Sequence, residues 1–489
     1  MSARKIIAID QGTTSTRAIR FDDRGHPEVT ASRDLTQHYP HSGWVEQDPE
    51  QIWQNTCAVV HEVMSDGVAA IGITNQRETI LLWDRKTGQT LYPAIVWQDR
   101  RTAGLCSELI EQGAEGAINA RTGLVLDPYF SAGKLRWLLD NVEGARARAE
   151  RGELAAGTID TFLLWRLTAG RVHATDVTNA SRTSLYNIGT YAWDEELLRL
   201  FGVPARLLPA VHGNCHEFGA TDAALFGRTL PIAGMAGDQQ SALIGQACLQ
   251  AGMVKATYGT GCFLLAHLGS KPLFSTKRLL TTVAYRIGED NAYALEGSIF
   301  SAGASIKWLR DGLHLFAKAA ETARLASSVP ADHGVYLIPA FVGLGAPHWR
   351  ADLRASITGL TFEVGPAHLV RAALEATVFQ TCEIVESMLE DGVAPPREIR
   401  IDGGMAMNDW FAQFLADMLQ RPVERAQSVE ATALGAAYLA GMTVGVWSSC
   451  AELESMWRSG GRFEPVATRA TSVGKLNGWR DAVRRALLK

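Results

Sequence analysis

Short apolar runs that end in an acidic residue or a glycine turn recur along the chain. Residues 6–9 lead into Asp10 and a Gly-Thr-Thr turn, and residues 230–236 lead into Gly237 and Asp238. Runs of this length, bounded by turn residues, are typical of buried strands. Open α/β sheets place their chemistry beyond the carboxyl ends of the strands, so we expect these acids to lie at a functional edge.

The two halves of the chain begin alike. Residues 6–16 and 253–265 each predict a strand, a glycine turn and a second strand, and residues 399–404 supply a third strand and turn. This pattern predicts an internally duplicated sheet-plus-helix unit, and so an α/β fold, rather than a short-period repeat. We place the boundary between two domains so that they comprise residues 1–247 and 248–489.

Other elements have clear start and stop signals. Asp48 followed by Pro49 predicts the N-terminus of a helix that runs to about Met64. The remaining predicted elements are strands at 69–74 and 79–83, helices at 193–201, 241–249 and 409–419, and a hairpin at 21–25.

One segment has the length of a membrane-spanning helix. Residues 431–450 carry no charge over twenty positions, which is the span a bilayer requires. The segment is, however, rich in Ala, Thr and Ser, and contains Gly435, Gly441 and Gly445. We therefore predict a helix packed tightly against a sheet, and not an integral membrane protein.

Composition narrows the class of protein. The chain has 489 residues and a net charge of −5, so it is long enough for two to four domains and lacks the basic balance of a nucleic-acid-binding protein. Its seven cysteines are scattered without a CxxC pair, which favours a reducing compartment over a disulfide framework. Because Asp10 interrupts the first apolar run, no signal peptide is expected, and we predict a cytoplasmic protein.

The first turn carries groups that suit a phosphate. Amides and hydroxyls in the turn from Gly12 to Thr16 match phosphate oxygens, Arg17 adds a positive charge, and Asp10 suits Mg²⁺ held through water. An ordinary hairpin whose Asp accepts turn amides explains the same residues equally well.

Three further segments allow a structural or a functional interpretation. Arg77 and Glu78 form a solvated loop by default, or else bind the hydroxyls of a small polyol. Trp97 is a core residue or an apolar wall for a ligand's carbons. Tyr129 is a half-buried turn residue or a hydrogen-bonding partner of a substrate hydroxyl.

Asp238 and Gln239 stand at the most informative junction. Asp238 is expected to be a helix N-cap, a general base that accepts the proton of a substrate hydroxyl, or both, because a capping carboxylate stays ionised near the positive helix end. Two phosphate-binding turns that face one carboxylate would transfer a phosphoryl group to a hydroxyl.

Motifs of other enzyme classes are lacking. The pairs His38/His41 and His212/His216 have metal-ligand spacing, but neither has a second ligand pair, so they are expected to be loop histidines. The chain has no Walker-type, Rossmann or GxSxG motif in a plausible context.

Taken in order, these residues resemble the FGGY family of carbohydrate kinases. The similarity runs from residue 5 to about residue 465 and includes both family signatures, at 129–141 and 355–375. The matching segments begin at Ala8, Gly43, Gly72, Ile95, Asp127, Thr175, Gly237, Thr257, Gly303 and Gly343.

The resemblance implies an actin-like ATPase (ribonuclease H-like) fold, with two α/β domains and a cleft between them. It implies phosphorylation of glycerol to sn-glycerol 3-phosphate by Mg²⁺–ATP, with Asp238 as the base and a homodimer or homotetramer as the assembly. Implied glycerol-binding residues are Arg77, Glu78, Trp97, Tyr129, Asp238, Gln239 and Phe263. Implied nucleotide contacts are Thr13, Thr14, Ser15, Arg17, Gly259, Thr260, Gly303, Lys307, Gly404 and Asn408, while Asp10 (through water) and Asp238 would serve Mg²⁺.

The chain departs from the family pattern at a few positions. Lys307 stands where the family usually has Gln, and Arg350 stands where it usually has an acidic residue. Ala224 takes the place of a histidine on which some members are phosphorylated. The loop that contains Ala224 also lacks the sequence pattern that resembles a fructose 1,6-bisphosphate site in some family members. We therefore expect regulation neither by histidine phosphorylation nor by fructose 1,6-bisphosphate. Two alternatives stay open: a kinase for another small polyol or ketose, and an actin-like nucleotide-switch protein that turns over ATP without an acceptor hydroxyl.

Overall fold

The computed structural model describes residues 4–488. Its first half is built on a six-stranded sheet in the order β13-β14-β5-β1-β2-β3, in which β1 pairs parallel to β5 and antiparallel to β2. The strands are β1 (Lys5–Gln11), β2 (Ser15–Phe21), β3 (Pro27–Asp34), β5 (Val68–Asn75), β13 (Cys215–Ala220) and β14 (Pro231–Gly237).

The second half repeats this arrangement. Its sheet has the order β17-β18-β16-β15-β21-β22-β23, and again an antiparallel hairpin (β15 and β16) is followed by two parallel strands (β21 and β22) and an antiparallel edge. The predicted duplication is therefore confirmed. The strands are β15 (Val254–Tyr258), β16 (Cys262–Gly269), β17 (Leu280–Ile287), β18 (Asp290–Ile299), β21 (Ile399–Asp402), β22 (Val423–Ala426) and β23 (Ser459–Phe463).

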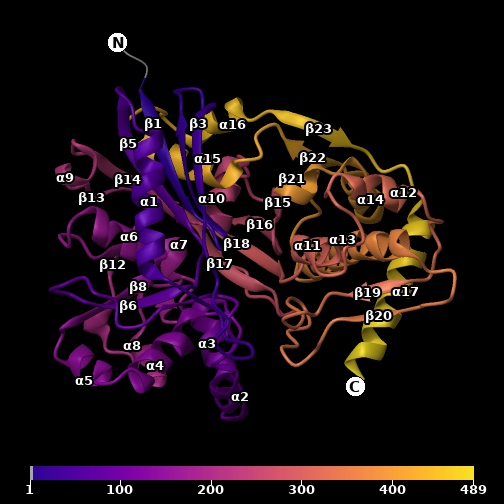
Figure 1. Cartoon of the computed structure of the whole chain (residues 1–489), viewed down its shortest axis with the longest axis horizontal. Coiled ribbons are helices and arrows are strands. Elements are labelled where there is room, and N and C mark those ends of the chain that lie inside the picture. Colours follow the sequence, from indigo (N-terminus) through magenta and orange to yellow (C-terminus); the bar gives the residue numbers. More distant parts are fainter. Residues whose placement is uncertain (1–3, 489) are drawn as a thin grey trace.

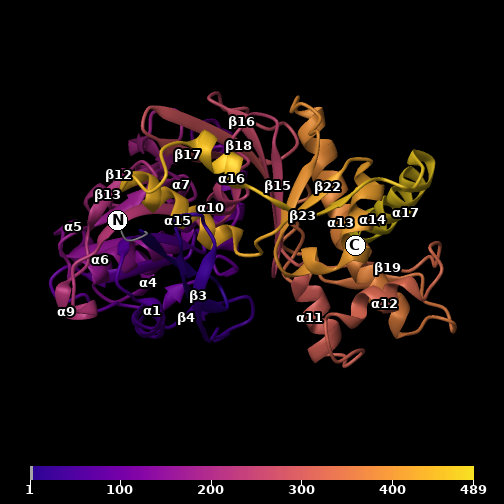
Figure 2. The same ribbon diagram turned by 90° about the horizontal axis from the view of Figure 1, so that it is seen from above.

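Helices cover both faces of the first sheet because side chains alternate along its strands. Ile7 and Ile9 pack with α1 (Pro49–Val63) and α6 (Ile159–Leu167), whereas Ile6 and Ala8 face α15 (Ala431–Thr443). The helix α15 thus comes from the last part of the chain and lies on the first sheet, as Figure 1 shows. Figure 2 shows α15 and α16 (Cys450–Met456) among elements of the first half.

Glycines allow α15 to approach its neighbours closely. A Cβ on Gly435 would lie 1.8 Å from the carbonyl oxygen of Ser241 in α10 (Asp238–Gly245), and one on Gly72 would lie 2.2 Å from that of Ala436. The uncharged segment at 431–450 therefore forms a tightly packed helix, as predicted, but only as far as Thr443; a turn that was not predicted follows. Among residues 4–488, no helix combines the length and apolar character needed to cross a membrane.

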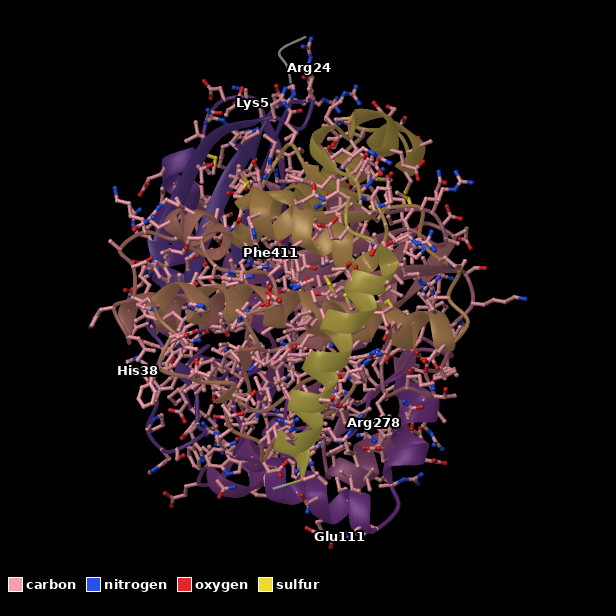
Figure 3. The ribbon with its side chains drawn as sticks, turned by 90° about the vertical axis from the view of Figure 1, so that its right-hand side faces the viewer. Lys5, Arg24, His38, Glu111, Arg278 and Phe411 are labelled. Atoms are coloured by element: carbon pink, nitrogen blue, oxygen red, sulfur yellow. The ribbon has the colours of Figure 1, made fainter. Side chains whose placement is uncertain are left out.

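Other helices cover the second sheet and a smaller layer extends the first half. The second core gathers α13 (Pro366–Glu390), α14 (Asp409–Leu419), α17 (Arg469–Leu487), α11 (Gly303–Asp311) and α12 (Glu321–Ser327). Figure 3 shows α17, in yellow, crossing the side of the molecule that faces the viewer. A four-stranded sheet in the order β4-β7-β6-β8 packs with its own helices. These elements are β4 (Glu46–Gln47), β6 (Ile80–Asp84), β7 (Ala94–Ile95), β8 (Leu154–Thr158), α2 (Ala103–Glu111), α3 (Glu115–Thr122), α4 (Ser131–Asn141), α5 (Ala145–Glu150) and α8 (Glu195–Phe201).

Short elements complete the chain between these layers. They are β9 (Ala174–Asp176), α7 (Val177–Ala180), β10 (Tyr186–Asn187), β11 (Ala192–Trp193), η1 (Ala205–Leu207), β12 (Ala210–His212), α9 (Ala223–Phe226), β19 (Tyr336–Ile338), β20 (Ser356–Thr358) and η2 (Gly404–Met407).

Most predicted boundaries hold to within two residues. Asp48 caps α1 by accepting from the amide of Glu50, as expected. The prediction that Asp238 is an N-cap is wrong: Gly237 holds that position, and Asp238 is the first residue of α10, which begins three residues earlier than predicted. The division into residues 1–247 and 248–489 stays a prediction, since α15 packs across it.

Candidate functional site

The guanidinium of Arg77 lies at the centre of a buried charge network. Arg77 lies two residues after the end of β5 and is only 2% exposed, so it is not the solvated loop residue that its sequence suggests by default. Its Nη1 and Nη2 donate to the two carboxylate oxygens of Glu296 at 2.5 and 3.0 Å. Its Nε lies 3.1 Å from Oδ1 of Asp238, and Nη2 lies 3.3 Å from the hydroxyl of Tyr129.

A second buried arginine completes this network. Arg182 follows α7, donates through Nε to Oε1 of Glu78 at 2.7 Å, and donates through Nη2 to Oε1 of Glu296 at 2.9 Å. Burial by itself would raise the pKa of Glu296, but Arg182 and Arg77 outweigh burial and lower that pKa to about 2. Glu296 is therefore an ionised clamp that belongs to β18 of the second half and holds two arginines of the first.

The carboxylate of Glu78 is held at one oxygen and free at the other. Oε1 accepts from Arg182, whereas Oε2 makes no hydrogen bond with any residue in the range 4–488 and is not sealed from solvent. Burial raises the pKa of Glu78, although Arg77 and Arg182 both act in the opposite direction. The backbone of Glu78 has a φ of 48°, a left-handed conformation that is uncommon outside glycine and frequent at functional sites.

Asp238 has the same kind of arrangement. Its Oδ1 accepts from the backbone amide of Gln239 at 2.7 Å and pairs with Arg77, while no hydrogen bond within the described chain uses Oδ2. The side chain is 28% exposed. Burial raises its pKa, and Arg77 and Lys255 oppose that rise. A carboxylate with one fixed and one free oxygen is suited to accept a proton from a bound hydroxyl.

Aromatic rings form an apolar wall beside these polar groups. The ring of Trp97 lies 5.6 Å from that of Tyr129 and 5.9 Å from that of Phe263, and all three belong to one small core cluster together with Phe300. Phe263 and Phe300 come from the second half of the chain, so the wall is built from both halves. This apolar surface adjoins the charge network, because the guanidinium of Arg77 lies 5.6 Å from the ring centroid of Phe263.

The first glycine turn adjoins this wall. Nε1 of Trp97 donates to Oγ1 of Thr13 at 2.9 Å, and Thr14 and Ser15 complete the turn, in which the amide of Gly12 donates to the carbonyl of Ser15 at 3.0 Å. Thr14 is exposed. The turn therefore presents amides and hydroxyls beside the wall.

Asp10 and Arg17 face each other next to the first turn. Arg17 donates from Nη2 to Asp10 at 2.6 Å and from Nη1 to Glu430, which precedes α15, at 2.9 Å. Burial raises the pKa of Asp10 and Arg17 opposes that rise, while Asp10 in turn contributes to the raised pKa of Asp238. These two carboxylates thus act on each other across the site.

The second glycine turn meets the start of α11. Gly259 and Thr260 are exposed, and their carbonyls accept from the amides of Gly303 and Ala304, both at 3.0 Å. A Cβ on Gly303 would lie 2.5 Å from the carbonyl oxygen of Gly259. Three of the predicted nucleotide contacts are thereby brought together at one end of β15.

The remaining predicted nucleotide contacts lie nearby, with structural roles of their own. Gly404 opens η2, and its neighbour Gly403 packs against the backbone of Tyr258. Asn408 caps α14 by accepting from the amide of Phe411 at 3.1 Å, a role that was not predicted. Lys307 is exposed on α11.

The second departure from the family pattern lies at the surface. Arg350 pairs with Asp352 at 2.7 Å on the protein's exterior. Arg350 therefore forms an ion pair with a residue two positions along the same exposed segment.

Few residues are available to bind a metal ion. Within residues 4–488, no cluster of three or more His, Cys, Asp or Glu side chains is placed to hold one, and His212 and His216 stack on each other with ring centroids 4.0 Å apart. The seven cysteines are free thiols. Among the contacts of the described residues, Asp10 keeps one oxygen without a hydrogen bond. This arrangement fits Mg²⁺, since that ion retains several waters and often uses only one or two carboxylates.

Sequence reasoning missed five residues of the site. Arg182 and Glu296 complete the charge network, Lys255 binds Gln239 and Phe300 extends the wall. Glu430 binds Arg17. Two of them had a usable signal: Glu296 is the one charged residue in the buried part of β18 (residues 292–299), and Lys255 is the one charged residue of β15.

Comparison with known proteins gives a consistent result. Residues 5–245 match the N-terminal domain, and residues 254–444 the C-terminal domain, of the FGGY family of carbohydrate kinases. A glycerol kinase of Gluconobacter oxydans is 56% identical over 487 residues, covering 99% of this chain and 95% of the relative. A glycerol kinase of Rhodospirillum centenum is 57% identical over 486 residues, covering 98% of this chain and 97% of the relative.

Solved structures agree with these relatives. The structure of Plasmodium falciparum glycerol kinase with ADP has a TM-score of 0.90 at 38% identity, covering 100% of this chain and 99% of that one. A ligand-bound xylulose kinase of Lactobacillus acidophilus has a TM-score of 0.87 at 21% identity, covering 99% and 98%, which shows a shared fold. The two-domain α/β architecture with its duplicated sheet is thus the actin-like ATPase fold of these kinases. The chain belongs to the FGGY family of carbohydrate kinases.

Proposed function

We propose that this chain is an ATP:glycerol 3-phosphotransferase, which converts glycerol and ATP to sn-glycerol 3-phosphate and ADP. The observation that carries the proposal is the pair of carboxylates, Glu78 and Asp238, each with one oxygen fixed by a buried arginine and one oxygen free beside an aromatic wall. The high identity to glycerol kinases over nearly the whole length supports the same substrate.

Asp238 is the proposed general base. Its free Oδ2 takes the proton of a terminal hydroxyl of glycerol as the oxygen of that hydroxyl attacks the γ-phosphorus of ATP. The bond from the γ-phosphorus to the bridging oxygen breaks, and ADP leaves. Such proton transfer contributes less to phosphoryl transfer than positioning and charge stabilisation do. The raised pKa of Asp238 makes it a better proton acceptor than an ordinary carboxylate.

The polyol pocket explains selectivity for a small triol. Glu78 accepts and Gln239 donates hydrogen bonds to hydroxyls, while Trp97 and Phe263 contact the carbons. A ligand that lacks a hydroxyl would leave one of these buried polar groups unpaired, and this is how such sites reject analogues.

The two glycine turns are proposed to hold the nucleotide. Thr13, Thr14 and Ser15 would meet phosphate oxygens from one half, and Gly259 and Thr260 from the other; Arg17, Gly303, Lys307, Gly404 and Asn408 would border the rest of the nucleotide. Asp10, through water, and Asp238 would serve Mg²⁺, which neutralises the charge of the phosphates when bound. A cytoplasmic location and a homodimeric or homotetrameric assembly remain predictions.

An acceptor panel tests the proposal. ADP release is measured with glycerol, dihydroxyacetone, xylulose, gluconate and no acceptor. We expect turnover that requires glycerol. Turnover that prefers xylulose or gluconate would overturn the substrate assignment and support a kinase for another polyol or ketose. Turnover that ignores every acceptor would support a nucleotide switch instead.

A further inference from the structure

A fully buried lysine lies next to the proposed polyol pocket, and the only effect described for it so far is that it opposes the rise in the pKa of Asp238. Lys255 belongs to β15 and is 0% exposed. Its Nζ donates to Oε1 of Gln239 at 2.6 Å and to Oγ1 of Thr257 at 3.0 Å. Burying an ammonium group is costly unless it is paired. The charges of Asp402, Asp238 and Glu296 act on this group, but its side-chain hydrogen bonds within the described residues go to the neutral groups of Gln239 and Thr257. The two hydrogen bonds to Gln239 and Thr257 therefore indicate the role of Lys255.

In the hydrogen bond between Lys255 and Gln239, the donor can only be the lysine. An ammonium group donates hydrogen bonds and never accepts them, so Lys255 must face the amide oxygen of Gln239. The amide nitrogen Nε2 then points elsewhere by necessity. It makes no hydrogen bond within residues 4–488 and is not sealed from solvent.

The backbone of Gln239 ties this amide to the base. Its N–H donates to Oδ1 of Asp238 at 2.7 Å, so the free amide nitrogen belongs to a residue whose main chain is already fixed at the reaction site. On its other side Lys255 binds Thr257, two residues before the exposed turn at Gly259. One ammonium group thus connects the polyol side with the phosphate turn of the other half.

We propose that Lys255 is a positioning residue that locks the side-chain amide of Gln239 with its NH₂ group toward the polyol, so that Gln239 donates to a substrate hydroxyl. Without the ammonium group, the amide can rotate and offer its oxygen or its nitrogen. The inference rests on the proposed function because it assigns Gln239 to the acceptor substrate.

A double-mutant cycle between Lys255 and Gln239 tests this role. Lys255→Met, Gln239→Ala and the double variant are assayed for kcat and for KM of glycerol and of ATP. We expect Lys255→Met to raise the KM for glycerol about tenfold, and the KM for ATP less, because a displaced or unpaired buried hydrogen bond has a cost of this order. The double variant is expected to be no worse than Gln239→Ala alone, since Lys255 acts through that amide.

Two further variants separate positioning from a general loss of structure. Lys255→Arg keeps a buried cation that can donate to Oε1 of Gln239. Its KM for glycerol is therefore expected to lie between those of Lys255→Met and wild type. Lys134, also fully buried, donates to the backbone carbonyl of Tyr129 at 2.6 Å and does not contact Gln239. Lys134→Met and Gln239→Ala are therefore expected to have fold-changes that multiply.

The outcomes are distinct. Fold-changes of Lys255→Met and Gln239→Ala that multiply would overturn the inference, as would equal effects on the two KM values. If the wild-type protein uses another acceptor, the proposed function fails, and the same cycle run with that acceptor still decides the role of Lys255. If it uses no acceptor, both proposals are overturned. Thermal unfolding of each variant confirms that folded protein is compared.

Discussion

The guanidinium of Arg77 binds both carboxylate oxygens of Glu296, at 2.5 and 3.0 Å, across the two halves of the molecule. Arg182 binds the same carboxylate. One acid of the second half therefore fixes the two arginines that contact Glu78 and Asp238 in the first half, and the proposed polyol pocket depends on residues of both halves.

Glu296→Gln is expected to impair both stability and glycerol binding. Breaking a buried ion pair typically costs about 3–5 kcal/mol, and the released arginines would take up the free oxygens of the site. We expect lower stability in urea and a glycerol kcat/KM reduced by at least about tenfold, since 1.4 kcal/mol corresponds to a factor of ten. Glu153→Gln, at an exposed ion pair with Arg151, is the matched control and should leave both unchanged; an equal loss in the control would refute the prediction.

The stability advantage of wild type over Glu296→Gln should depend on pH. The pKa of Glu296 is lowered from 4.5 to about 2 in the folded protein, so its stabilising contribution is complete above the unfolded pKa and is lost as the pH falls toward the folded one. The difference in unfolding free energy should be full at pH 7 and narrower at pH 3.5. A difference that does not change between these values would show that Glu296 does not stabilise as a carboxylate.

Asp238→Asn tests the base directly. The amide keeps the size of the side chain but cannot take a proton, so kcat should fall about 10²–10⁴-fold while the KM for glycerol changes little. Asp222→Asn, at the exposed cap of α9, is a suitable control because Asn also caps helices. Stopped-flow or coupled ADP release measures both; a kcat within a factor of a few of wild type would exclude Asp238 as the base.

The pH profile of the reaction provides another check. Burial raises the pKa of Asp238 above 3.8, and Arg77 and Lys255 oppose that rise. The base must be ionised, so kcat/KM for glycerol should decline as the pH falls through a value above 3.8. Lys255→Met removes an opposing charge and should move this decline to higher pH. Because ATP ionises identically in assays of the variant and of wild type, its ionisation cancels from the comparison. A shift of the decline to lower pH in Lys255→Met would contradict the assignment of Asp238 as the base.

The contact between α10 and α15 should tolerate no added methyl group. A Cβ on Gly435 would meet the Ser241 carbonyl at 1.8 Å, whereas one on Gly474 in α17 meets nothing within 4 Å. Gly435→Ala should therefore destabilise by about 1–3 kcal/mol or more, and Gly474→Ala should stabilise by about 0.5–1 kcal/mol through helix propensity. Urea unfolding of both variants measures this contrast, and equal effects would mean that the helices can separate without cost.

The sequence predicts the parts of this molecule that are encoded locally. The duplicated strand and turn and the cap at Asp48 follow from patterns of a few neighbouring residues. Such patterns also make Arg77, Glu78, Tyr129 and Asp238 candidates, but only the resemblance to the family implies their roles. The burial of Arg77 does not, because an Arg-Glu pair after a strand has the same pattern in a solvated loop. Its partner Glu296 lies 219 positions away, and no local spacing connects them.

The place of α15 has a consequence for how the protein is made. A ribosome that has completed residue 247 has synthesised every strand of the first sheet, yet the helix that covers Ile6 and Ala8 is nearly two hundred residues from being translated. Domains usually fold as units during synthesis, N-terminal first. Here the nascent first half should keep an apolar face uncovered until Thr443 has emerged, and it should depend on chaperones for that interval. Pulse proteolysis of stalled chains would show whether protection begins only after α15 is complete.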